Sequence, residues 1–346
     1  MTKKIYVLLI VAIAVVILIY AQTIIIPFFL AIIFWFMIRV IKKAILRIHY
    51  LRKWPEWIFT IFSTALLFSF LVFIIGMITK NIQYLSNALP DYQANFVEIK
   101  RSLGSQFNID LETIFSNYAE QFEFTAILSS LLSTLTSLFS AAFAVFLYLV
   151  FILLEEATFS KKIRVLYPDN EKYQKVTLMI SKIDHSVQQY IALKTIVSLA
   201  TGILSYFTLL FIGVDAPAFW AFLIFVLNYI PNIGSLIATL FPAVFTLFQF
   251  GELTPGFLVL FIVGSIQMVV GNFLEPKIMG NSLNISPLIV LLTLAVWGVM
   301  WGITGMLLSV PITIILIIIM AEFPSTRPIA ILLSQDGQLN RSEKHK

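Results

Sequence analysis

The chain has 346 residues, of which 60% are hydrophobic and only 12% are charged, and its formal net charge is +5 at pH 7. Soluble domains are about half apolar and about a quarter charged, so this composition excludes an ordinary soluble protein and indicates a membrane protein with several spans. The positive charge does not indicate a nucleic-acid-binding protein, because the cations gather beside apolar runs, where membrane topology accounts for them.

Two apolar runs, 5–20 and 24–38, come first and are followed by a basic segment. That segment, Arg39–Lys53, contains Arg and Lys residues but no acid, and by the positive-inside rule it lies in the cytoplasm. We expect the two runs to form a tight hairpin that turns at Gln22, Thr23 and Pro27, with the N-terminus in the cytoplasm. One long tilted helix is the alternative, and it would place the N-terminus outside. A cleaved signal peptide is disfavoured, because more apolar sequence follows directly.

Helix 57–79 is expected to lead outward to a polar segment that is rich in Asp and Glu. Apolar residues recur there with helical spacing over 92–103 and again over 111–122, which predicts a small external helical segment. Helix 131–154 then returns to the cytoplasm. Beyond it lies an amphipathic helix whose apolar face is expected at the lipid interface or against a partner, with a solvated linker helix as the alternative; the sequence favours neither. The residues of that face are Val176, Met179, Ile180, Ile183, Val187 and Tyr190.

The C-terminal half contains the same unit twice, at an offset near 70 residues. Each copy is a membrane-length helix, 193–213 or 256–274, followed by a long apolar stretch that Pro, Gly and Asn interrupt near its middle. The interruptions fall at 228–235 and at 297–305. The matching anchors are Pro217, Gly234 and Pro242 in the first copy, and Pro287, Gly305 and Pro311 in the second. Duplicated units with broken helices are typical of carriers that bind a solute where the repeats meet.

The sequence therefore predicts an all-α polytopic membrane protein. We expect about six through-spans plus two broken, re-entrant hairpins, or eight or more spans, with an inverted repeat in the C-terminal half. The predicted divisions are N-terminal transmembrane helices at 1–80, an external segment at 81–130, a transmembrane helix at 131–156, a cytoplasmic linker at 157–192, a transport unit at 193–322 and a cytoplasmic tail at 323–346.

Unwound backbone at membrane depth is tolerated only where protein buries it or where it lines a watery cavity. Each break is therefore interpreted as the tip of a solute-binding element, and a tight turn between helices is the alternative. Helix 193–213 adds a face of polar and small residues, for which helix packing is the alternative. The predicted solute contacts are Asn228, Pro231, Asn232, Gly234 and Ser235 at the first break, Lys194, Ser198 and Thr201 on the helix, Asn272 after helix 256–274, and Gly302, Thr304 and Gly305 at the second break.

Other residues near these sites have competing explanations. Lys194 lies near the cytoplasmic end of its helix, where it can simply extend to the lipid headgroups. Gly298 and Gly302 have the spacing that permits close helix packing. Trp297 and Trp301 are interpreted as interfacial anchors, with aromatic walls for an organic solute as the alternative.

Glu275 is the predicted ion-coupling residue, because a carboxylate next to an apolar run can respond to protons or cations. A plain interface charge paired with Lys277 is the alternative. No other acid lies well inside a predicted span, which counts against a dedicated cation antiporter.

The sequence does not indicate an enzyme. No His-Glu-x-x-His, Gly-x-Ser-x-Gly or P-loop motif is present, and all three histidines fall in polar segments. The absence of cysteine excludes disulfides and thiolate metal ligands. We therefore expect no catalytic residues, no metal site and no cofactor.

Four segments resemble the autoinducer-2 exporter (AI-2E) family of bacterial membrane proteins. They are Tyr190–Thr195 with Ser198 and Gly202, Leu227–Gly234, Gly271–Gly280 and Trp301–Pro311. The resemblance covers most of the chain, and Lys194-Thr195 with Trp297-Gly298 is most similar to the branch that contains the quorum-signal exporter. It implies a multi-pass protein of the bacterial inner membrane that exports a small polar organic signal as a homo-oligomer.

Residues and resemblance together predict a secondary carrier that exports a small polar solute, such as autoinducer-2, by alternating access. In this mechanism the broken tips and the Lys194 face would enclose the solute between the repeats. The expected partners are this solute, the lipid bilayer and further copies of the chain, with no nucleic acid, and both termini are expected in the cytoplasm. A monovalent cation (Na⁺ or Li⁺)/proton antiporter and a non-transporting oligomeric scaffold or regulator are the alternatives.

Overall fold

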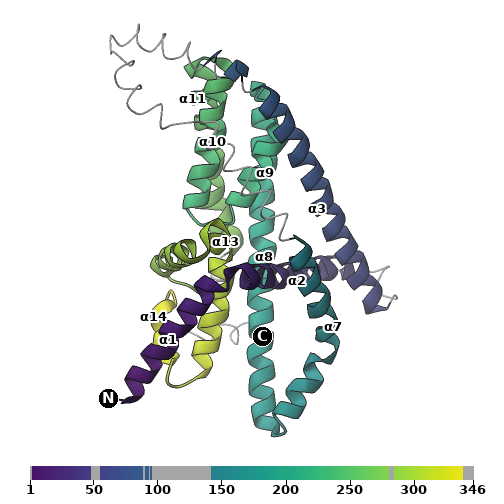
Figure 1. The fold of residues 1–346 in the computed structure, drawn as a ribbon, viewed down its shortest axis with the longest axis vertical. Helices are drawn as coiled ribbons and strands as arrows, with labels where there is room; N and C mark the ends of the chain where they lie inside the picture. Colours follow the sequence, from purple (N-terminus) through teal and green to yellow (C-terminus); the bar gives the residue numbers. More distant parts are fainter. Residues whose placement is uncertain are drawn as a thin grey trace. The chain divides into compact units, whose positions relative to one another are not determined.

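The computed structural model describes residues 2–47, 55–88, 90–92, 94–95, 142–279 and 284–337. These residues are almost entirely helical and include no strand, so the prediction of an all-α protein is confirmed (Figure 1). They gather into two compact units: the described residues up to 65, from 142 to 194 and from 279 onward form the first, and those from 66 to 95 and from 195 to 278 form the second. The predicted external helices at 92–103 and 111–122 fall almost wholly outside the described residues.

The first unit begins with α1 (Thr2–Tyr20) and α2 (Gln22–Leu46), which Ala21 separates. The chain therefore forms two helices here, but the turn predicted to include Pro27 is wrong, because Pro27 lies inside α2. Proline removes only one backbone hydrogen bond from this helix. The buried side chains of Ala31 and Phe36 pack α2 against its neighbours despite this loss.

Helices α7 (Ala142–Leu166), α13 (Pro287–Glu322) and α14 (Arg327–Leu333) complete the first unit together with the start of α8 (Asn170–Ile212). Its core is a cluster of buried apolar side chains from α2, α8, α13 and α14. The buried members are Phe36, Val187, Tyr190, Ile191, Ile285, Val310, Ile314, Ile317 and Ala330. Because lipid tails are as apolar as these side chains, close van der Waals packing is what holds the membrane-spanning helices of this unit together.

The second unit contains most of α3 (Glu56–Asn87), the later part of α8, and α9 (Pro217–Leu227) with α10 (Ile233–Phe250). It continues with α11 (Leu253–Val269), a π-helix at Val270–Leu274 and α12 (Glu275–Met279). Aromatic rings hold α9 to α10, since the ring of Trp220 lies 4.9 Å from that of Phe245. Tyr92 contacts the same phenylalanine edge-on at 5.2 Å.

Helix α8 is continuous over 43 residues. The sequence predicted a linker helix and a separate span beginning at 193, but the structure joins them because no proline, glycine pair or turn residue interrupts 170–212. Asp169 caps the start of the helix, since its carboxylate accepts hydrogen bonds from the backbone amides of Glu171 at 2.8 Å and Lys172 at 3.2 Å.

Seven helices in the described part of the chain are long and apolar enough to cross a membrane. They are α2, α3, α7, α8, α10, the α11–α12 run and α13. Helix α9 has 11 residues, which at 1.5 Å per residue span about 16 Å, well short of the roughly 30 Å hydrocarbon core. The chain is therefore an integral membrane protein with several spans. Re-entry of the two hairpins stays a prediction, with full crossing as the alternative.

Both broken elements are confirmed as sharp reversals of the chain. Helices α9 and α10 are separate, and α13 contains one residue with non-helical backbone, Gly302 (φ 62°, ψ −143°). A Cβ atom on Gly305 would lie 2.0 Å from the carbonyl oxygen of Trp297, although residues eight apart in a straight helix are about 12 Å apart along its axis. Figure 1 accordingly shows α13 as two arms that point in different directions.

Candidate functional site

A buried polar cluster joins α8 to the end of α9 in the second unit. The Asn228 side chain, 6% exposed, donates through Nδ2 to the hydroxyl of Ser198 at 3.3 Å and to that of Thr201 at 3.5 Å. Both hydroxyl-bearing residues are fully buried, and the Thr201 hydroxyl also donates to the Val197 carbonyl at 2.9 Å. The usual range for N–H···O bonds is about 2.7–3.2 Å, so the Asn228 amide is held by two long, weak bonds.

Close helix packing brings these groups together. Gly202 lies on α8 beside the cluster, and a Cβ atom there would come within 3.2 Å of the Ala221 carbonyl and 3.3 Å of Phe225 Cβ on α9. A larger residue would push the two helices apart. The predicted polar, small face of helix 193–213 is therefore the face that packs against α9.

A second hydrogen bond lies one turn earlier on α8. The hydroxyls of Thr195 and Tyr229 are 2.6 Å apart, and the Tyr229 ring packs edge-on against Phe225 at 5.7 Å. Neither residue was predicted as a solute contact. The signal for Thr195 was the step of three residues from Thr195 to Ser198 and again to Thr201, which continues the polar face toward the N-terminus of α8.

The first break separates residues that the sequence analysis grouped together. Asn228 points into the protein, whereas Asn232 is exposed and adopts a left-handed backbone (φ 59°). The Ser235 hydroxyl donates to the Asn232 carbonyl at 2.8 Å, a local hydrogen bond within the first turn of α10. Pro231, which precedes Asn232, is half-buried. Solute contact by Pro231, Asn232 and Ser235 stays a prediction.

Gly234 closes the same turn. A Cβ atom on it would lie 1.9 Å from the carbonyl oxygen of Leu227 and 2.9 Å from Ile230 Cβ. Gly305 occupies the equivalent place in the second break, where a Cβ atom would lie 2.0 Å from the Trp297 oxygen and 2.9 Å from Trp301 Cβ. The two breaks thus use one kind of turn, in which only glycine lets the two arms approach.

At the second break, Gly302 is the exposed pivot and Thr304 is half-buried. Close packing through Gly302 was a competing explanation, but no atom lies within 4 Å of where its Cβ would be. Trp301 is not an interfacial anchor, because it is 5% exposed and its indole Nε1 donates to the Leu18 carbonyl at 2.9 Å. That carbonyl belongs to the last turn of α1, where helix carbonyls lack partners within the helix.

Lys194 is buried, with 3% of its surface exposed, so it does not extend to the headgroups as one explanation held. It shares helix α8 with Ser198, Thr201 and Ser205, all of them fully buried. The Ser205 hydroxyl has no hydrogen-bond partner among the described residues. Contact of Lys194 with the solute stays a prediction.

Asn272 and Glu275 lie at the end of the α11 run, where the helix widens into the π-helix Val270–Leu274. The Glu275 amide donates to the Val270 carbonyl, five residues earlier. Pro276 explains this widening, because its ring would clash with the carbonyl four residues before it in a regular α-helix. Asn272 is exposed and Glu275 is half-buried. π-Turns occur frequently at functional sites, and the sequence analysis did not anticipate this one.

The structure therefore brings together Ser198, Thr201 and Asn228 within the second unit. Gly302, Thr304, Gly305 and Lys194 belong to the first unit, and Asn232 and Asn272 face outward from the second. Within the described residues, no three His, Cys, Asp or Glu side chains are close enough to hold a metal ion.

Comparison with known proteins identifies the family of this chain. The model of the AI-2E family transporters matches residues 6–325, nearly the whole chain. This chain belongs to the AI-2E transporter family. Membership makes it a membrane transporter, as the sequence resemblance implied.

Relatives of this AI-2E transporter match it over most of their length. A candidate transport protein of Haemophilus influenzae is 31% identical over 321 residues, which cover 90% of each chain. A candidate transport protein of Borreliella burgdorferi is 33% identical over 258 residues, which cover 73% of this chain and 70% of the relative. The AI-2 transport protein TqsA of Escherichia coli strain K12 is 31% identical over 321 residues, which cover 91% of this chain and 90% of TqsA.

Proposed function

We propose that this protein exports a small polar organic solute across the bacterial inner membrane, and that its polar cluster at Ser198, Thr201 and Asn228 contacts the solute. The observation that supports this proposal is the Asn228 amide, which is buried among apolar helices yet held by bonds of only 3.3 and 3.5 Å. A buried polar group with weak partners can exchange them for those of a ligand at little cost in free energy.

The relative TqsA is named an AI-2 transport protein, which makes AI-2 the solute to test first. A polar, uncharged solute suits the cluster, because an amide and two hydroxyls supply donors and acceptors but no charge. Each hairpin turn is hinged by a glycine that permits close approach of its arms, and such turns are the parts that we expect to move during alternating access.

The test is efflux of labelled AI-2 from proteoliposomes that contain the full-length protein. Thr201→Val keeps the shape of the side chain but removes the hydroxyl that faces Asn228. We expect it to slow efflux by about twofold to tenfold, since the solute would lose one neutral hydrogen bond to the cluster, which is worth about 0.5–1.5 kcal/mol.

Thr208→Val is the matched control. Thr208 lies on the same helix, and its hydroxyl also donates to the carbonyl four residues earlier, at 3.0 Å, but the residue is outside the cluster. Equal efflux by the two variants would reject the cluster as the solute site.

Absence of AI-2 efflux from proteoliposomes that contain the wild-type protein would exclude AI-2 as the solute. Cation-dependent proton flux in the same liposomes would then test the antiporter, with Glu275→Gln as the variant. Glu275 is half-buried beside a π-turn, a position where protonation and helix geometry can be coupled.

A further inference from the structure

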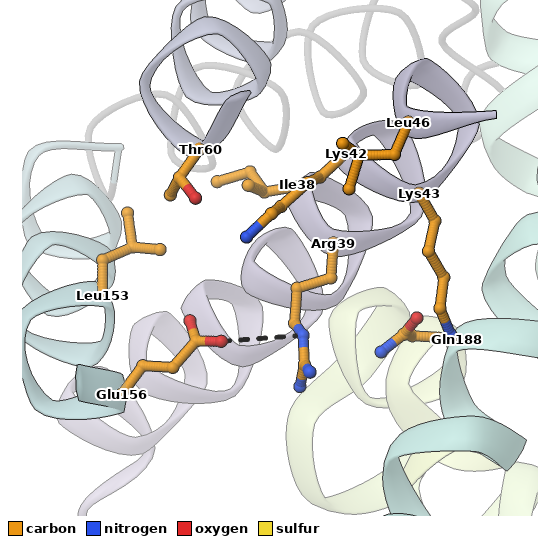
Figure 2. A pocket seen from close by; sticks show the side chains of 9 residues that line it. All are labelled: Ile38, Arg39, Lys42, Lys43, Leu46, Thr60, Leu153, Glu156 and Gln188. Carbon is orange, nitrogen blue, oxygen red and sulfur yellow. Dashed lines mark ion pairs between the residues drawn. The ribbon is translucent and has the colours of Figure 1, made fainter. Parts of the chain in front are cut away.

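A polar cavity of about 230 Å³ lies within the first unit, and none of its lining residues belongs to the polar cluster of Ser198, Thr201 and Asn228. Helices α2, α3, α7 and α8 line it, and its polar side chains are Arg39, Lys42, Lys43, Thr60, Glu156 and Gln188 (Figure 2). One water molecule occupies roughly 30 Å³ in the liquid, so the cavity has room for a group several times larger. The basic segment of α2 places it on the side that the positive-inside rule predicts to be cytoplasmic.

The cavity carries an excess of positive charge. Arg39 Nη1 donates to Asp184 at 2.5 Å, and its Nε lies 3.7 Å from a Glu156 oxygen. Figure 2 shows the second of these pairs. The side chains that line the cavity include three cations, Arg39, Lys42 and Lys43, and one acid, Glu156.

The arginine is also fixed in place. Its guanidinium lies 4.8 Å from the Trp35 ring centroid, and the same tryptophan donates through Nε1 to Glu156 at 2.7 Å. A guanidinium held by two carboxylates and a ring presents its remaining N–H groups in a defined direction, which suits recognition of an oxyanion.

Gln188 supplies a second, independent indication of a ligand. The residue is 4% exposed, and its Nε2 donates to Asp184 at 2.6 Å. Its Oε1 atom is buried and has no hydrogen-bond partner in the described part of the chain. In Figure 2 the side chain extends from α8 toward Arg39. A buried acceptor without a partner is costly, so a ligand that donates a hydrogen bond would stabilise it.

We propose that this cavity binds a phosphate ester that carries a hydroxyl group. The phosphate oxygens accept hydrogen bonds from Arg39, Lys42 and Lys43, and the hydroxyl donates to Gln188 Oε1. The glycerol phosphate headgroup of phosphatidylglycerol has this chemistry, and so does free glycerol 3-phosphate. Basic pockets between membrane helices on the cytoplasmic side commonly bind anionic headgroups. The site does not depend on which solute the protein exports.

The experiment measures Tm of the full-length protein in neutral detergent while a ligand is titrated, since a ligand that binds only the folded state raises Tm. We expect phosphatidylglycerol to raise Tm and phosphatidylcholine to leave it unchanged. If glycerol 3-phosphate raises Tm as well, the headgroup alone is sufficient. If it does not, the source of the ligand is the lipid. Both results support the site, and no rise with either phosphate ester overturns it.

The variant Lys42→Gln/Lys43→Gln tests the cationic wall. We expect its apparent affinity for phosphatidylglycerol to fall about tenfold or more, the usual effect of losing a hydrogen bond to a charged group. Lys161→Gln/Lys172→Gln is the matched control, because it removes the same net charge at exposed positions outside the cavity. An equal loss of affinity in both double variants would show attraction to net charge alone and would overturn the proposal.

Gln188→Met tests the hydroxyl contact. Phosphatidylethanol keeps the phosphodiester but has no hydroxyl. The wild-type affinity for phosphatidylglycerol should exceed that for phosphatidylethanol by about twofold to tenfold, the usual effect of one neutral hydrogen bond. The variant should bind the two lipids equally. A preference that survives in Gln188→Met would overturn the role of Gln188.

Discussion

Substitution of Gly234 by alanine tests whether the first hairpin depends on the close approach of its two arms. The new Cβ would lie 1.9 Å from the Leu227 carbonyl oxygen. Ordinary contact begins at 3.4 Å, so the oxygen would have to move by about 1.5 Å. The obstacle is backbone and cannot rotate away as a flexible side chain would.

Overpacking of this kind costs about 1–3 kcal/mol, occasionally more, and a backbone clash belongs at the upper end of that range. Alanine regains about 1 kcal/mol through its better helix propensity, which leaves a net loss of about 2 kcal/mol. At roughly 1–2 °C per kcal/mol for a chain of this length, Tm should fall by about 2–4 °C. Gly305→Ala should lower Tm by a similar amount, because its Cβ would meet the Trp297 oxygen at 2.0 Å.

Intrinsic tryptophan fluorescence of the purified protein in detergent provides the measurement. Gly76→Ala is the matched control, since this glycine lies inside α3 with no atom within 4 Å of the added Cβ. The control should keep or slightly raise Tm. If Gly234→Ala and Gly76→Ala have the same Tm, the argument from close approach is refuted.

Three further substitutions have defined outcomes. Burial and the 2.7 Å hydrogen bond to Asp215 raise the pKa of Tyr92. Tyr92→Phe removes this bond and should lower the free energy of unfolding by about 1.5–3 kcal/mol, measured as a fall in Tm. Hydrogen bonds from the backbone amides of Lys172 and Glu171 hold the pKa of the Asp169 carboxyl below its ordinary value, so this carboxylate stabilises the start of α8 above that ordinary value and loses the effect as the pH falls through the lowered pKa. Asp169→Asn should remove this pH dependence of amide exchange at the start of α8. Trp301→Phe removes the hydrogen bond to the Leu18 carbonyl and should cost about 1 kcal/mol, also measured by Tm.

The sequence was sufficient to locate both hairpins. Proline and glycine interrupt long apolar runs there, and the physical reason is local: glycine permits the positive φ and the close approach that the turns require. The sequence also showed that Gly234 and Gly305 occupy matching positions in the two copies. In the structure, each glycine permits the close approach of the two arms of its hairpin. Composition was likewise sufficient for the all-helical membrane class.

The direction of individual side chains could not be read from the sequence. Asn228 and Asn232 are four residues apart and would share a face of a regular helix, but the left-handed backbone at Asn232 turns it outward. Lys194 looked like a residue near a helix end, and its burial follows from tertiary packing that no local pattern encodes. Trp301 was predicted at the membrane interface because no local pattern shows its hydrogen-bond partner, the Leu18 carbonyl, which is 283 residues away in sequence.

The π-helix before Pro276 sets the angular position of every residue that follows it in the run. One extra residue per turn rotates the downstream helix by about 100° relative to a regular α-helix. Deletion of a single residue within Val270–Leu274, combined with Pro276→Ala to remove the clash that favours the wide turn, would therefore restore regular geometry and carry the Glu275 carboxylate to a different side of the helix. The length of this short segment, as much as the identity of the glutamate, determines what that carboxylate can reach.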